Sequence, residues 1–230
     1  MNWQDLAIAV ACRIEFERKC LREPLLSESS AVWFAAQVLQ AHWNGKILPE
    51  QPHPNIPRAK IDLVGRTPRD NAYNLALEAK YIDPEGGTRE WLKELYEDVH
   101  RMQHFTGPAM NQHTQRVVLI VGPVGSIRSD IFDRKVQYGG GMTQALPHLL
   151  PTSLEQGSIV YTRDGFHVNI RPWLKKVREE MTVNLASHYA AQMVGKFATG
   201  TTDDAIEAVV WKTTRRPRWT HFDPRTTWLA

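Results

Sequence analysis

The chain has few cysteines and no long apolar run. Only two of its 230 residues are cysteine. Cys12 and Cys20 fall in one predicted helix, about 12 Å apart along its axis, which is farther than a disulfide reaches. No apolar stretch approaches the roughly 20 residues of a membrane span, and the first residues lack the order of a signal peptide. These absences predict a cytoplasmic protein without a disulfide framework or a membrane partner.

The sequence also lacks the complete motifs of two other kinds of site. His100 and His104 have a metal-ligand spacing, but no Glu follows His100, as the zinc-protease pattern requires. The segment from Gly122 to Gly125 follows a predicted strand, yet it lacks the Gly-Lys-Ser/Thr ending of a phosphate-binding loop. Both observations weigh against a zinc protease and a P-loop nucleotide-binding protein.

Charge is unevenly distributed along the chain, although its total is only +3. Residues 1–100 hold 12 Lys and Arg against 15 Asp and Glu, which leaves 16 against 10 for residues 101–230. The first part is therefore acidic, at −3, and the second basic, at +6. Such an arrangement fits a cation site that meets a polyanion, but asymmetry of this size is common.

Apolar spacing predicts an α/β fold whose sheet is partly antiparallel. Helices are expected over residues 3–21, 28–43, 88–104, 127–136 and 172–191. Strands are expected over residues 46–49, 58–65, 75–82, 116–121, 158–161, 166–170 and 205–213, and the strands at 158–161 and 166–170 are expected to form a hairpin. For the second helix we expect a buried stripe formed by Val32, Phe34, Ala35, Val38 and Leu39.

Asp62, Glu78 and Lys80 are the most informative residues. Each lies in an apolar segment that is expected to form a strand. Because strand side chains alternate between faces, Glu78 and Lys80 share one face. If the two strands pair, Asp62 reaches the same small volume as Glu78. Two carboxylates and an ammonium group at one sheet edge suit a hard divalent cation and a phosphate.

The order of these elements resembles the PD-(D/E)xK nuclease superfamily, which has the restriction-endonuclease-like fold. The resemblance covers about residues 27–122. Asp62 matches the first metal-binding acid of the family, Glu78 the second, and Lys80 the family's lysine. Glu28 is the best match to the acid that many members carry on the preceding helix. The usual proline before the first acid is replaced by Ile61.

The resemblance implies a Mg²⁺- or Mn²⁺-dependent nuclease that hydrolyses phosphodiester bonds of nucleic acid, with DNA favoured over RNA, through a metal-activated water. Asp62 and Glu78 would hold the cation, with the carbonyl oxygen of Ala79 as a third ligand. Lys80 would orient the water or offset charge on the phosphate, and Glu28 would bind a second metal or hold Lys80 in place. The alternatives are an inactive module that binds nucleic acid and a subunit of a larger defence or mobile-element complex.

The implied architecture has a mixed central sheet flanked by helices. Residues 1–122 would form the nuclease-like core with its N-terminal helices. Residues 123–230 would form an α+β extension packed on the same domain, with a role in substrate binding. Relatives of this kind work as homodimers or with a partner subunit, and the sequence does not distinguish between these.

Basic residues outside this group are candidates for contacts with nucleic acid. Lys93 and Arg101 lie on the helix after Lys80, where they either contact phosphates or form ion pairs on a solvated helix face. Near the C-terminus, arginines interleave with tryptophan, which suits backbone contacts and base stacking; the alternative is a tail whose tryptophan packs on the core. These C-terminal candidates are Arg215, Arg216, Arg218 and Trp219. Among the acidic residues outside this group, Glu50 is a weaker candidate for an extra acidic contact.

Overall fold

The computed structural model describes residues 2–68, 72–83, 90–105, 110–138, 141–166, 170–180, 185–186, 188–215 and 221–222. Its α-helices are α1 (Trp3–Lys19), α2 (Glu28–His42), α3 (Trp91–His104), α4 (Val124–Ile127) and α5 (Arg171–Glu180). Its strands are β1 (Lys46–Pro52), β2 (Lys60–Arg66), β3 (Tyr73–Tyr81), β4 (Met110–Pro123), β5 (Lys135–Tyr138), β6 (Gly141–Gln144), β7 (Ile159–Thr162), β8 (Leu185–Ala186), β9 (His188–Ala198), β10 (Ile206–Arg215) and β11 (His221–Phe222).

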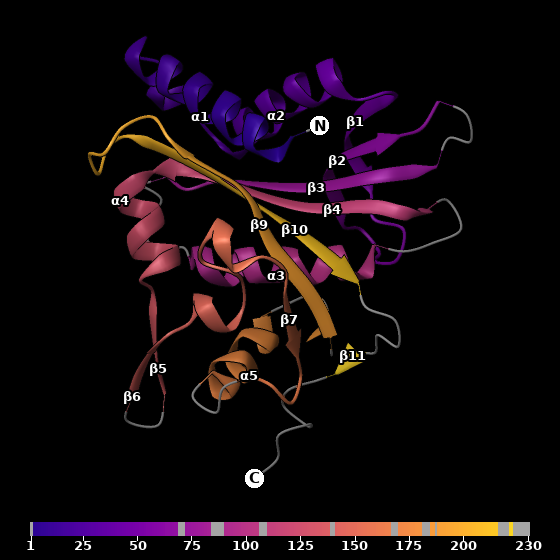
Figure 1. Ribbon diagram of the computed structural model, residues 1–230, viewed down its shortest axis with the longest axis vertical. Helices are drawn as coiled ribbons and strands as arrows, with labels where there is room; N and C mark the ends of the chain where they lie inside the picture. The colour runs from indigo at the N-terminus through magenta and orange to yellow at the C-terminus, as the bar shows by residue number, and fades with distance from the viewer. Residues whose placement is uncertain are drawn as a thin grey trace.

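A seven-stranded sheet with the order β1-β2-β3-β4-β10-β9-β7 forms the centre of the molecule (Figure 1). β3 and β4 are parallel, and the other neighbouring strands are antiparallel. A parallel pair needs a long connection between its strands, and α3 lies in the connection between β3 and β4. Helices α1 and α2 cover one face of the sheet, and α3 lies on the other (Figure 1). The prediction of an α/β fold with a mixed sheet between helices is confirmed.

The sheet is buried on both faces, and β4 shows why its sequence is continuously apolar. Val117, Leu119 and Val121 point into the layer formed with α1 and α2. Val118 and Ile120 alternate with them and point into the layer that contains α3. A strand buried on both faces has no position for a polar side chain, so its sequence reads as one apolar run. β10 continues the same two layers, so the C-terminal strands extend the central sheet.

Downstream of β4, several predicted elements were wrong. The helix expected at 127–136 ends at Phe132 in a short π-helical turn and is followed by β5. Of the hairpin expected about Asp164-Gly165, the first strand forms as β7 and pairs with β9, and residues 167–169 of the expected second strand lie outside the described residues. The helix expected at 172–191 ends at Glu180, and its last residues belong to β8 and β9. The pairing of β9 with β10 overrides the helix preference of its alanines.

The buried stripe expected on α2 was also wrong in part. Ala31, Ala35 and Leu39 are fully buried, whereas the larger Val32, Phe34 and Val38 are only half-buried. Small side chains let α2 approach α1 and β3 closely, and the larger apolar residues are displaced to the flanks of the helix. One flank faces β1 and β2.

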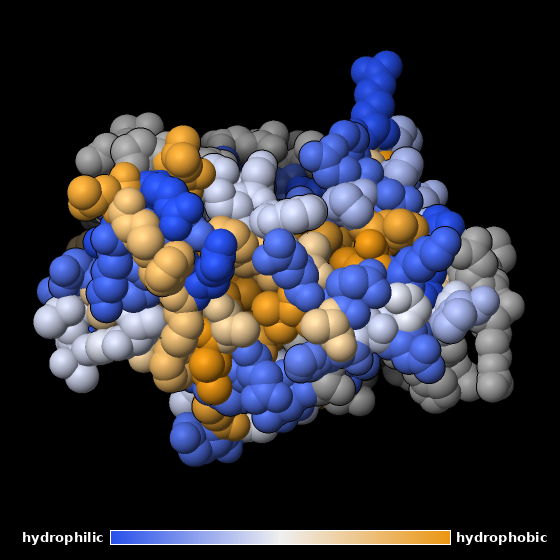
Figure 2. All heavy atoms as spheres, turned by 90° about the horizontal axis from the view of Figure 1, so that it is seen from above, coloured by the Kyte–Doolittle hydropathy of each residue, from blue (hydrophilic) through white to orange (hydrophobic). Residues whose placement is uncertain are grey.

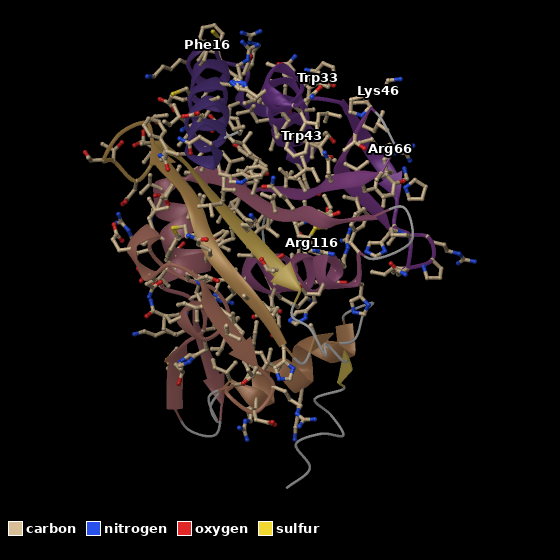
Figure 3. All side chains as sticks on the ribbon, turned by 45° about the vertical axis from the view of Figure 1, so that its right-hand side comes forward. Phe16, Trp33, Trp43, Lys46, Arg66 and Arg116 are labelled. Carbon is tan, nitrogen blue, oxygen red and sulfur yellow. The ribbon has the colours of Figure 1, made fainter. Side chains whose placement is uncertain are left out.

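The C-terminal end of α2 is fixed against the sheet by Trp43, which lies between the helix and the strands (Figure 3). The indole Nε1 donates a hydrogen bond to Oδ1 of Asn74 at 3.2 Å. A Cβ at Gly65 would lie 2.8 Å from that Nε1 atom, so only glycine leaves room for the ring beside β2. The ring therefore sets the spacing between α2 and β2.

None of the described helices has the length and apolar character needed to cross a membrane. Cys12 and Cys20 are exposed and free, as their spacing predicted.

Candidate active site

The hydrogen-bond ladder between β2 and β3 stops half-way along β3. Its last pair is Leu63 with Leu77, whereas the ladder between β3 and β4 continues as far as Tyr81. Asp62 lies one position beyond that last pair. Its Oδ2 accepts a hydrogen bond from the backbone N–H of Ala79 at 2.8 Å. The Asp62 carboxylate thus takes the place of a strand partner for β3. We call residues 78–81 of β3, which pair with β4 but not with β2 on the described ladders, the free half of that strand.

Glu78 lies on the free half of β3 and faces α3. Its side chain is only 2% exposed, and its Oε1 accepts a hydrogen bond from Nη2 of Arg101 at 2.8 Å. Arg101 also donates through Nη1 to Oδ1 of Asp98 at 3.1 Å and through Nη2 to the carbonyl oxygen of Lys60 at 2.8 Å. One guanidinium group therefore ties together α3, β2 and β3.

Lys80 is held between the helices on the two faces of the sheet. Its Nζ lies 3.2 Å from Oε2 of Glu28 on α2 and 3.5 Å from Oδ2 of Asp98 on α3. The Lys80 side chain is 12% exposed, so its ammonium group is mostly withdrawn from water. Glu28 is in the first turn of α2, where the helix dipole favours a carboxylate. The ion pairs therefore hold the Lys80 side chain from two sides.

The pKa values of this cluster reflect an excess of buried carboxyl groups. Burial raises the pKa of Glu78 well above its usual value, and the negative charges of Asp98 and Asp62 raise it further. Burial likewise raises the pKa of Asp98 to about 6, although Lys80 and Arg101 oppose that shift. For Lys80, burial acts to lower the pKa, but Asp98 and Glu28 outweigh it and the pKa is raised. Lys80 is therefore positively charged at neutral pH, among carboxyl groups that repel one another.

The carboxylates suit a hard, partly hydrated cation better than a closed metal cage. Asp62 and Glu78 present oxygen ligands from neighbouring positions, and the buried Oδ2 of Asp98 has no hydrogen-bond partner among the described residues. No three His, Cys, Asp or Glu side chains in the described ranges form a ready-made metal site. Mg²⁺ keeps several waters and needs only one or two carboxylates together with substrate phosphate. The donor set fits such an ion, and Arg101 competes with it for Glu78.

A groove of about 830 Å³ opens beside these residues, between α2 and the strands β1 and β2. Glu28 and Asp62 line both the groove and the ionic cluster. The remaining lining residues are Ser29, Val32, Trp33, Ala36, Gln37, Gln40, Ala41, Ile47, Pro49, Glu50, Lys60 and Leu63. The groove lies within the size range of small-molecule pockets. The outer face of the α1–α2 layer shows apolar side chains exposed among polar ones (Figure 2).

Asp98 is a member of the cluster that was not among the site residues predicted from the sequence. It is 1% exposed. Its position carried a usable signal, because it lies three residues after Leu95 and four before Met102, which both belong to the buried face of α3. An acid on the apolar stripe of a helix indicates a buried partner, and here the partners are Lys80 and Arg101.

Among the residues predicted to bind nucleic acid, the structure describes the side chains of Lys93 and Arg101. Arg101 turns into the acidic cluster, and Lys93 is half-buried on α3. Arg215 ends β10, but its side chain lies outside the described residues, as do Arg216, Arg218 and Trp219. The weaker candidate Glu50 lies on β1, across the groove from α2, and forms an exposed ion pair with Lys60 at 2.6 Å.

Comparisons with protein-family models, with curated proteins and with solved structures gave no match. Any assignment of function therefore depends on the residues of this chain and their geometry.

Proposed function

We propose that this chain is a Mg²⁺- or Mn²⁺-dependent nuclease of the PD-(D/E)xK type, with a restriction-endonuclease-like core, that hydrolyses phosphodiester bonds in nucleic acid and preferably in DNA. The observation that carries the proposal is the meeting of Asp62, Glu78 and Lys80 where the β2–β3 ladder ends. An acid that replaces a strand partner, followed by Glu and Lys on one face of the next strand, places two carboxylates and one ammonium group in the same small volume.

Each residue has a chemical role in this proposal. A divalent cation held by Asp62 and Glu78 would stabilise charge on the scissile phosphate and supply a bound water of lowered pKa. The hydrogen bond from Ala79 N–H fixes the orientation of the Asp62 carboxylate. Lys80 remains protonated and can donate a hydrogen bond to a phosphate oxygen as negative charge grows there. Glu28 and Asp98 position the Lys80 side chain from opposite sides.

Arg101 favours a second candidate function, in which the module binds nucleic acid without cutting it. Its guanidinium group already neutralises part of the charge of Glu78 and Asp98. If that pairing persists with substrate present, Glu78 is not available to a cation. The domain would then contact nucleic acid or a partner subunit through the same surface.

Incubation with plasmid DNA, single-stranded DNA and RNA, with Mg²⁺ or Mn²⁺ and with EDTA, distinguishes the two candidates. The nuclease proposal expects cleavage that depends on the divalent cation and is lost in Asp62→Ala and in Lys80→Ala. Cleavage that persists in either variant would overturn the proposed site. Salt-dependent gel shifts without cleavage would favour the binding module.

A further inference from the structure

The groove beside the ionic cluster has an apolar floor, formed by partly buried residues that pack against the core from the flank of α2. Ala31, Ala35 and Leu39 already bury the inner face of α2. Val32 and Ala36 nevertheless extend the apolar surface toward β1 and β2, where the groove lies. Apolar residues on a second flank of a surface helix indicate a surface that another group covers.

Trp33 lies on the same wall of the groove and is 59% exposed. It stands at the outer surface of α2 (Figure 3). The neighbouring Gln37 amide is exposed and has no hydrogen-bond partner among the described residues. An exposed indole with a free amide one helical turn away provides a stacking surface and a polar group that can bind the edge of a planar ring.

The charges around the groove select the kind of group that fits. Glu28, Glu50 and Asp62 line it, and among the described residues of its wall Lys60 is the single Lys or Arg. Lys60 is already paired with Glu50 at 2.6 Å. A phosphate would be repelled by this acidic lining, whereas an uncharged aromatic ring would not. Glu28 and Asp62 are shared by the groove and the Lys80 site, but beside Lys80 an ammonium group can offset their repulsion of a phosphate.

We propose that the groove between α2 and β1–β2 binds one unpaired nucleobase of a single-stranded substrate, stacked on Trp33, while the adjoining phosphate lies at Lys80. This inference rests on the proposed nuclease function and adds to it the substrate class, a single strand or an unpaired base in a duplex. A base within an intact duplex is stacked and paired, so it must leave the helix before it enters a groove of this kind.

The experiment compares Trp33→Ala with Phe16→Ala. Phe16 lies on the outer surface of α1, is 51% exposed and does not line the groove, so it is the matched control (Figure 3). A single-stranded oligonucleotide that carries one 2-aminopurine is titrated with each protein in EDTA, and its anisotropy and fluorescence are recorded. A duplex of the same sequence is the second probe.

Trp33→Ala is expected to weaken single-strand binding about 5- to 150-fold, since stacking on one aromatic ring contributes that much. Quenching of 2-aminopurine should be lost with it, and Trp33→Phe should restore both. Phe16→Ala should bind as the wild type does. Duplex affinity should change less than twofold in all variants.

The outcomes separate this inference from the function on which it rests. If the wild type cleaves nucleic acid and Trp33→Ala binds single strands with unchanged affinity, the base-binding groove is wrong and the nuclease proposal stands. An equal loss in Phe16→Ala, or an equal loss on duplex, also overturns the groove. If the wild type neither binds nor cleaves any nucleic acid with Mg²⁺ or Mn²⁺, the proposed function fails, and the groove with it.

Discussion

The two halves of β3 differ in how they are held. The first half pairs with both β2 and β4, and Leu75 and Leu77 point into the apolar layer beneath α1 and α2. The second half pairs with β4 alone on the described ladders, and its face toward α3 carries Glu78 and Lys80. In this half, ion pairs and the hydrogen bond from the backbone N–H of Ala79 to the Asp62 carboxylate replace a strand partner. Because the ladder between β2 and β3 ends half-way along β3, charged groups can occupy the space beside this strand inside the folded domain.

The largest expected effect is on cleavage, in the free half of β3. Lys80→Met keeps the length and apolar stem of the side chain but removes its charge. We expect the cleavage rate to fall about 10²- to 10³-fold, the usual loss when one donor to a transition-state oxygen is removed. Lys46→Met is the control, because Lys46 is an exposed lysine on β1. Equal rates for both variants in a quenched time course would remove Lys80 from the site.

The comparison of the two halves also predicts that the free energy of unfolding depends strongly on a side chain in the first half of β3 and only weakly on one in the second. Leu77→Ala should lower the free energy of unfolding by about 2–5 kcal/mol, because Leu77 is fully buried and leaves a cavity. Glu78→Gln should stay within about 1 kcal/mol of the wild type, because glutamine retains an acceptor for Arg101 and removes a charge that burial disfavours. Urea denaturation at pH 7.5 measures both. A larger loss for Glu78→Gln than for Leu77→Ala would contradict the comparison.

A smaller effect should appear at His53, which supports the site from the loop after β1. Its Nδ1 accepts hydrogen bonds from the backbone N–H groups of Asn55 and Ile56, both at 3.1 Å, and its Nε2 lies 3.1 Å from the carbonyl oxygen of Arg101. Burial, with a smaller contribution from the positive charges of Arg101 and His104, lowers the pKa of His53 to about 4. The ring is therefore neutral in the folded protein near pH 5.

The sign of the resulting pH dependence follows from that shift. Between pH 6.5 and about 4 the unfolded chain binds a proton at His53 that the folded chain does not, so His53 makes folding less favourable as the pH falls. The difference in unfolding free energy between the wild type and His53→Asn should shrink as the pH is lowered from 7 to 4.5. Taking the difference cancels the titration of Asp98, which acts in the opposite direction. A difference that stays constant with pH would show that His53 is not buried as described.

The first part of the fold could be predicted because its signals are local. The helical spacing of α3, the apolar run of β4 and the alternation in β3 each depend on neighbouring residues. The strand expected at 158–161 forms as β7, but its pairing with β9 and the existence of β9 itself could not be predicted in this way, because both depend on partners distant in the sequence. Ala190 and Ala191 favour a helix in isolation, yet they pair with β10 and β7 in the sheet.

The candidate site was predictable where its residues share one short segment. Alternation along one strand places Glu78 and Lys80 on the same face, and the pairing of two strands that follow each other in the chain brings Asp62 to them. Asp98 and the guanidinium of Arg101 come from α3, and their place depends on how that helix docks on the sheet. The groove was beyond sequence reasoning, because its walls come from α2, β1 and β2 and depend on how that helix packs against the sheet.

The central claim is that the carboxylates of Asp62 and Glu78 bind a divalent cation at the free half of β3. Calorimetric titration of Mn²⁺ into the wild type, Asp62→Asn, Glu78→Gln and Glu50→Gln tests it without any substrate. Glu50 is the control, because it is an exposed acid in the same groove and is paired with Lys60. We predict one Mn²⁺ site that is weakened at least about tenfold in Asp62→Asn and Glu78→Gln and unchanged in Glu50→Gln. No binding by the wild type, or equal binding after Asp62→Asn, would contradict the account.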